Sequence, residues 1–183
     1  FCLSRGLGDV YKRQLPLDKS KEAVTLWGLN SHLPGTGGLI GSSVVADSED
    51  GQIAYGIEEA MDERGFTVNE TMKGFYASET CAPYYRKASF FGNEVPGHSL
   101  VPAFSASYNE ADTYTVGEAP AELYTDDILE SAKDTTAVVV LSRDSSEASD
   151  YSTNMKDPNG DSFDTPMSIS AYEKEMIQLA KEN

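Results

Sequence analysis

Apolar and polar residues along the chain alternate with the periods of strands and of helices in turn. Residues 23–30 (AVTLWGLN) are apolar and partly β-branched, which predicts a buried strand that runs into a turn. Four apolar residues at helical spacing then precede Gly65, where a helix would end: Ile53, Ile57, Ala60 and Met61. Residues 66–69 predict a second strand, and a strand–helix–strand order is typical of a parallel crossover.

The C-terminal part of the chain predicts a helix, a strand and a second helix. Thr125 is a suitable N-cap for a helix with two aspartates in its first turn (126–127), where carboxylates favour the helix dipole. The apolar side of this helix holds Leu123, Ile128, Leu129 and Ala132. Residues 137–142 predict the next strand. Ser170 and Glu173 then form a capping-box pattern ahead of a helix that would bury Tyr172, Met176, Ile177 and Ala180.

Buried strands that alternate with amphipathic helices predict an α/β fold. We expect a three-layer sandwich around a mostly parallel sheet. No strand follows the last helix, although a crossover helix normally leads to one. The sheet should therefore be incomplete at its C-terminal side, and we expect the intact protein to continue beyond Asn183.

The first residues do not resemble protein that was selected to fold. Residues 1–14 (FCLSRGLGDVYKRQ) look like the end of a sequencing adapter translated in frame, and the chain lacks an initiator methionine. We exclude them as a non-native scar. Residues 15–183 are then expected to form part of one domain, long enough to bury a sizeable core.

Charge and cysteine content narrow the classes of partner. The chain carries a net charge of −16, and residues 1–14 contribute +2, so the remainder carries −18. Such a surface repels phosphate backbones and anionic headgroups, so we expect neither nucleic acid nor a membrane as partner. Cys81 stands alone once Cys2 is excluded, which rules out a disulfide framework. A reducing compartment is compatible with this, and Asn69-Glu70-Thr71 has meaning as a glycosylation acceptor only in a secreted protein.

Most aromatic residues gather in a stretch at about 70–120, which we interpret as an insertion. They are Phe75, Tyr76, Tyr84, Tyr85, Phe90, Phe91, Phe104, Tyr108 and Tyr114. These rings serve either as a wall that stacks on a flat ligand such as a sugar, or as a small core for the insertion. We favour the core interpretation and allow one or two rings both purposes.

Other motifs argue against a cofactor or a metal. The glycines of GTGGLIG (35–41) have the wrong spacing for a dinucleotide fingerprint, and no helical pattern follows them. Residues 157–164 begin like a calcium loop but place serines where that loop needs Gly and Glu. His32 and His98 have no metal-ligand neighbours at suitable spacing. We expect no metal and no cofactor, and keep a nucleotide-binding domain as a weaker alternative.

One acidic residue follows a strand at a position where ligands often bind. Glu147 lies in the polar loop after residues 137–142, with Asp150 three positions later. Ligands of open α/β sheets bind beyond the carboxyl ends of the strands. The position favours a functional role, although most loop glutamates are only solvated.

Several segments occur in a characteristic order: LPLDKSKEAVTLWGLNS, the glycines and serine at 37–42, YTVGEAPAELY, SRDSSEASD and SAYEKEMIQLAKEN. This order covers residues 15–183 and resembles the C-terminal α/β sandwich domain of glycoside hydrolase family 3, the β-glucosidase-like enzymes. The most specific piece is the family's Ser-Arg-x-x-Gly-Glu-Gly-x-Asp segment. It maps onto Ser142, Arg143, Ser146, Glu147, Ala148 and Asp150.

The resemblance implies retaining hydrolysis of a carbohydrate by two carboxyl groups about 5 Å apart. Glu147 occupies the position of the general acid/base, and Arg143 and Asp150 are candidate substrate-binding residues. Asp150 either binds a sugar hydroxyl or orders the loop, and we favour the ordering role. In such enzymes the nucleophile is an aspartate of a preceding barrel domain. That N-terminal barrel is therefore an expected partner, and this chain alone should be inactive.

Two residues depart from the family pattern. Ser146 and Ala148 replace the glycines that usually flank the glutamate, and both restrict the backbone. Either the loop is shaped for another substrate, or Glu147 has lost its role. The alternative function is a non-catalytic carbohydrate-binding or interaction module of the same fold.

Overall fold

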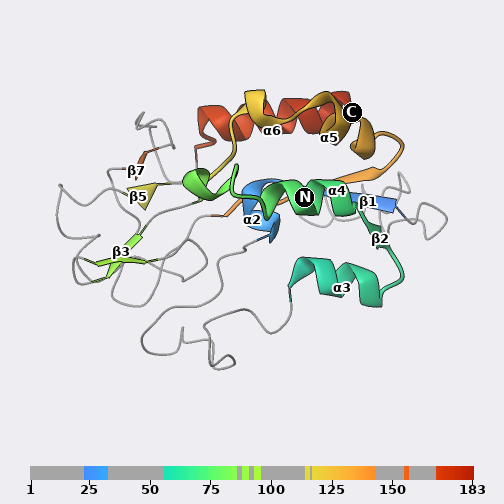
Figure 1. Ribbon diagram of the computed structural model, residues 1–183, viewed down its shortest axis with the longest axis horizontal. Coiled ribbons are helices and arrows are strands. Elements are labelled where there is room, and N and C mark those ends of the chain that lie inside the picture. Colours follow the sequence, from blue (N-terminus) through green and yellow to red (C-terminus); the bar gives the residue numbers. More distant parts are fainter. Residues whose placement is uncertain are drawn as a thin grey trace, which may run out of the picture.

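The protein is built around a small parallel sheet. The computed structural model describes residues 23–32, 56–85, 88–90, 93–95, 114–115, 117–142, 155–156 and 168–183. Within this part, β1 (Ala23–Trp27) lies between β2 (Thr67–Val68) and β6 (Thr136–Val139), and both neighbours run parallel to it (Figure 1). The α/β class expected from the sequence is confirmed.

Alternate side chains of β1 face two different apolar layers, because successive residues of a strand point to opposite faces. Val24 and Leu26 form one layer with Val68, and α3 (Ile57–Glu63) packs against it. Trp27 belongs to the other layer, with α4 (Glu70–Tyr76), α5 (Asp126–Ala132) and α6 (Ala171–Glu182). Figure 1 shows α3 on the opposite side of the strands from α5 and α6. The sheet therefore has helices on both faces.

The larger core is rich in aromatic rings. Trp27 stacks on Tyr124 with ring centroids 5.9 Å apart, and Phe75 lies 4.8 Å from the same tyrosine ring. Tyr76 is also buried, and Tyr84 and Tyr85 pack against this cluster from the outside. Two rings of the aromatic-rich stretch, Phe75 and Tyr76, thus belong to the main core of the domain, and Tyr84 and Tyr85 pack against it. The side chains of the other rings lie outside the described part.

Local signals placed β1, α3 and β2, but the helices α2 and α4 were not predicted. The first strand ends at Trp27 and leads into a single helical turn, α2 (Leu29–His32). Helix α3 is seven residues long, and Gly65 follows it with φ +83°, as the sequence indicated. Helix α4 was not predicted, because its residues were assigned to the insertion. Its N-cap is Asn69, whose side chain accepts hydrogen bonds from Thr71 N and Met72 N.

Both C-terminal helices begin after the predicted N-cap residues, but only one of the two side chains forms a capping hydrogen bond. The capping box of Ser170 and Glu173 is present at the start of α6, which buries Tyr172 and Met176. Thr125 is the N-cap of α5 by backbone conformation, but its side chain makes no capping hydrogen bond. The strand predicted at 137–142 is β6 and ends at Val139.

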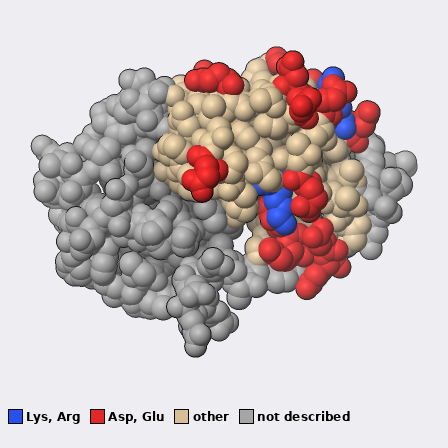
Figure 2. All heavy atoms as spheres, viewed as in Figure 1, with Lys and Arg blue, Asp and Glu red and all other residues tan. Residues whose placement is uncertain are grey.

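The remaining described elements are short. The 3₁₀ turns are η2 (Ala82–Tyr84) and η3 (Ala121–Leu123). β3 (Ala88–Phe90) and β4 (Asn93–Val95) form an antiparallel pair, and β5 (Tyr114–Thr115) pairs in parallel with β7 (Met155–Lys156). On the face seen in Figure 2, acidic side chains outnumber basic ones and gather over α3, consistent with the strongly negative charge.

Candidate functional site

The carboxyl ends of β1 and β6 meet at one edge of the sheet. Trp27 is in register with Val139, and the next residue, Val140, donates its backbone N–H to the carbonyl of Trp27 at 2.9 Å. The chain passes from β1 to β2 on one side and later returns to β6 on the other. Open α/β sheets bind ligands at such a reversal of strand order, beyond the carboxyl ends of the strands. This edge is therefore the candidate functional site.

Gly28 forms the turn that follows β1 at this edge. Its φ of +99° suits glycine, and a Cβ at this position would lie 2.6 Å from the carbonyl oxygen of Val140. Its backbone N–H donates to the hydroxyl of Tyr76 at 2.7 Å. Turn and neighbouring strand end are thus packed with no space for a side chain.

Glu118 is a fully buried carboxyl group beneath this turn. Its Oε1 accepts hydrogen bonds from the backbone N–H groups of Ala119 at 2.9 Å and Leu29 at 3.2 Å. Burial raises the pKa of Glu118 to about 8, although these backbone bonds oppose the shift, and the negative charge of Glu173 adds to it. A carboxyl group with this pKa is mostly protonated at neutral pH. Sequence patterning did not single out Glu118, because an isolated glutamate normally faces solvent.

Two tyrosine hydroxyls complete the buried polar group. The hydroxyls of Tyr76 and Tyr124 lie 2.9 Å apart, and the Tyr76 hydroxyl also holds the Gly28 N–H. Burial raises the pKa of both tyrosines above the ordinary value, so both stay neutral. These phenols, Glu118 and the backbone donors satisfy one another in a site closed to water.

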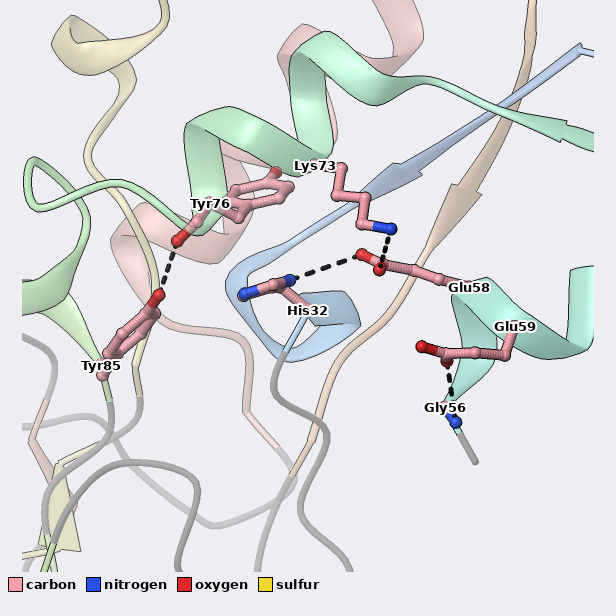
Figure 3. Close-up of polar contacts among 7 residues, drawn as sticks. All are labelled: His32, Gly56, Glu58, Glu59, Lys73, Tyr76 and Tyr85. Carbon is pink, nitrogen blue, oxygen red and sulfur yellow. Dashed lines mark hydrogen bonds and ion pairs between the residues drawn. The ribbon is translucent and has the colours of Figure 1, made fainter. Parts of the chain in front are cut away.

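A second polar cluster lies beside the first, where α2, α3 and α4 meet (Figure 3). His32 Nδ1 lies 3.4 Å from Glu58 Oε1, and Lys73 Nζ lies 3.1 Å from Glu58 Oε2. Burial raises the pKa of Glu58, but the hydrogen bonds from His32 and Lys73 outweigh it and leave the pKa below its ordinary value. The sequence predicted no acidic neighbour for His32, because Glu58 is 26 residues away and the fold brings it there.

Metal-binding and nucleophilic roles find no support in this part of the chain. Among the described residues, no group of three or more His, Cys, Asp and Glu side chains could hold a metal ion. Cys81 is buried, and its pKa is raised to about 11 by burial, so its sulfur stays a protonated thiol. No helix in the described part is long and apolar enough to cross a membrane.

Asn69, the potential glycosylation acceptor, is committed to the fold. Its Nδ2 donates to Thr25 Oγ1 and to the carbonyl of Ser131, both at 2.9 Å. A glycan on this nitrogen would displace both bonds, so the folded domain does not present Asn69 for glycosylation.

The catalytic candidates of the sequence lie outside the described residues. This applies to Glu147, Arg143 and Asp150, and also to His98 and the segments 35–41 and 157–164. Ser142 is the last described residue before that loop. The loop therefore starts at the candidate edge, and the roles of Glu147, Arg143 and Asp150 stay predictions.

Known proteins add no further assignment. A comparison with models of protein families, with curated proteins and with solved structures finds no match to this chain.

Proposed function

We propose that this chain is part of a retaining glycoside hydrolase of the β-glucosidase type and supplies the loop that carries the general acid/base, Glu147. One observation supports this above others: β6 is parallel to β1 and ends beside it, at the reversal of strand order. The chain leaves β6 at Val140, seven residues before Glu147. This loop therefore begins at the edge of the sheet where α/β domains bind ligands.

The chemistry requires two carboxyl groups in different states. One must be ionised to attack the anomeric carbon, and the other must be protonated to donate to the leaving oxygen. We assign the second role to Glu147 and the first to an aspartate of a preceding barrel domain. Arg143 then binds the carbohydrate, and Asp150 either orders the loop around Glu147 or binds a sugar hydroxyl.

The test is a leaving-group comparison in an enzyme that joins this chain to such a barrel. Glu147→Ala should slow hydrolysis of glycosides with poor leaving groups far more than that of aryl glycosides with activated ones, because only the former need a proton. Added azide should restore turnover of the activated substrates by replacing water as the nucleophile in the second step. Glu175→Ala, on the exposed side of α6, is the control and should change neither rate.

Equal losses for both classes of leaving group would overturn the acid role of Glu147. The competing function is a carbohydrate-binding module, which titration calorimetry of this chain alone with oligosaccharides would detect. The four described rings of the aromatic stretch do not favour it, since Phe75 and Tyr76 are buried and Tyr84 and Tyr85 pack against the same core.

A further inference from the structure

We propose that Glu118 is a positioning residue: its carboxyl group fixes the turn after β1 and, through Gly28, the point at which the chain leaves β6 toward Glu147. The consequence for catalysis rests on the proposed function of that loop. The link among Glu118, Gly28 and Val140 does not, because it consists of contacts within the described residues.

The first link joins Glu118 to the turn. Both carboxyl oxygens lie 3.2 Å from the backbone nitrogen of Leu29, and Oε1 also accepts from Ala119 N at 2.9 Å. One side chain thus holds two segments that are far apart in the sequence. Because Glu118 is fully buried, water does not compete for these bonds, and they are stronger than the same bonds at a surface.

The second link joins the turn to the end of β6. A Cβ at Gly28 would lie 3.3 Å from Glu118 Oε2 and 2.6 Å from the carbonyl oxygen of Val140. The side of Gly28 on which a Cβ would lie therefore faces both the Glu118 carboxyl group and the carbonyl oxygen of Val140. The N–H of Val140 is held by its hydrogen bond to the carbonyl of Trp27. Closely packed groups transmit a displacement, so a shift of the turn moves Val140 as well.

Ionisation of Glu118 should perturb the link from Glu118 through Gly28 to Val140, because of the groups that surround the carboxyl group. Among the described residues, the titratable groups that interact with it are Glu173 on α6, Tyr124 after η3, Tyr76 on α4 and Cys81 before η2. None of these four carries a positive charge, so none of them compensates the charge that forms when Glu118 ionises. The backbone N–H groups of Leu29 and Ala119, which donate to the carboxyl group, should therefore respond when Glu118 ionises.

Nuclear magnetic resonance of the whole 183-residue chain tests the proposal. The carboxyl carbon of Glu118 and the amide signals of Leu29 and Val140 would be followed from neutral to alkaline pH. We expect the carboxyl group to titrate with a midpoint near its pKa of about 8. Both amide signals should shift with the same midpoint. Glu118→Gln keeps the shape of the side chain, removes its charge and should abolish both shifts.

A matched control and two outcomes decide the matter. Glu175→Gln, exposed on α6, should leave both shifts unchanged. A Leu29 shift without a Val140 shift would overturn the proposal, because Glu118 would then serve the turn alone. Val140 shifts that persist in Glu118→Gln would overturn it as well. The wild-type titration remains decisive if that variant fails to fold. None of these signals depends on sugar hydrolysis, so the proposed function and this link fail independently.

Discussion

Gly28 and Val140 lie so close that a Cβ on residue 28 would be 2.6 Å from the carbonyl oxygen of residue 140. Each residue comes immediately after one of two neighbouring parallel strands, β1 and β6. The turn after the first strand therefore limits where the loop after the other can start. Four predictions follow from the contacts around this edge and around the crossover from β1 to β2.

Gly28→Ala should lower the free energy of unfolding by about 3 kcal/mol, because the methyl group adds a clash to a left-handed backbone. Urea unfolding followed by the fluorescence of Trp27, the single tryptophan and a buried one, measures this.

Two other glycines separate the cost of the left-handed backbone from the cost of the clash with Val140. Gly65 also has a positive φ, +83°, but a Cβ there would meet nothing within 4 Å, so Gly65→Ala should cost only about 1 kcal/mol. Gly74 lies in α4 with open space, and Gly74→Ala should stabilise the protein by about 0.5–1 kcal/mol. Equal losses at residues 28 and 65 would show that the Val140 contact has no energetic weight.

Glu118 should make the domain less stable as pH rises. Its folded-state pKa of about 8 lies above its ordinary value of 4.5, so the folded protein binds the proton more tightly than the unfolded chain. The stability from this group is complete below 4.5, declines between 4.5 and about 8, and is constant above that range. Glu118→Gln should remove this decline, on the order of a few kcal/mol, in urea unfolding measured at several pH values. A wild-type decline retained in the variant would assign it to other groups.

Glu58 should act in the opposite direction. Its pKa in the folded protein lies below 4.5, so its contribution is present above that pH and is lost as the pH falls through the folded-state pKa. Glu58→Gln should reduce the free energy of unfolding at neutral pH by about 1 kcal/mol and flatten the acid side of the stability curve. Asp62→Asn, an exposed residue of the same helix, is the control and should keep the wild-type slope. If the free energy of unfolding fell equally steeply with decreasing pH in wild type and Glu58→Gln, the contacts of Glu58 with His32 and Lys73 would be contradicted.

Asn69 should be important for the crossover because it both caps α4 and bonds across the sheet. Asn69→Ala removes both functions and should cost about 2–3 kcal/mol in thermal or urea unfolding. Asn69→Asp keeps the acceptor for Thr71 N and Met72 N but not the donor to Thr25 and Ser131. Its loss should be intermediate, and an aspartate variant as unstable as the alanine variant would show that capping contributes little.

Sequence patterns predicted the features that depend on nearby residues. The apolar run at 23–30 became β1, the segment 66–69 became β2, and the Ser170–Glu173 box became the start of α6. Each signal lies within a few positions, as strand alternation and helix capping require. The parallel α/β order followed from these elements. Helix α4 was missed because seven residues beside many aromatic ones matched the expected insertion better than a helix.

The polar groups at the candidate edge were decided by the tertiary structure alone. Glu118 and Leu29 are 89 residues apart, and His32 and Glu58 are 26 residues apart, so neither pair has a local pattern. Whether a glutamate faces water or core depends on which distant backbone and side-chain donors the fold brings to it, because only those donors offset the loss of solvent. The sequence by itself therefore determined β1, β2 and β6 and the helices α3, α5 and α6, and it suggested the loop of Glu147. Packing around the sheet determined that the carboxyl group of Glu118 is buried next to the start of that loop.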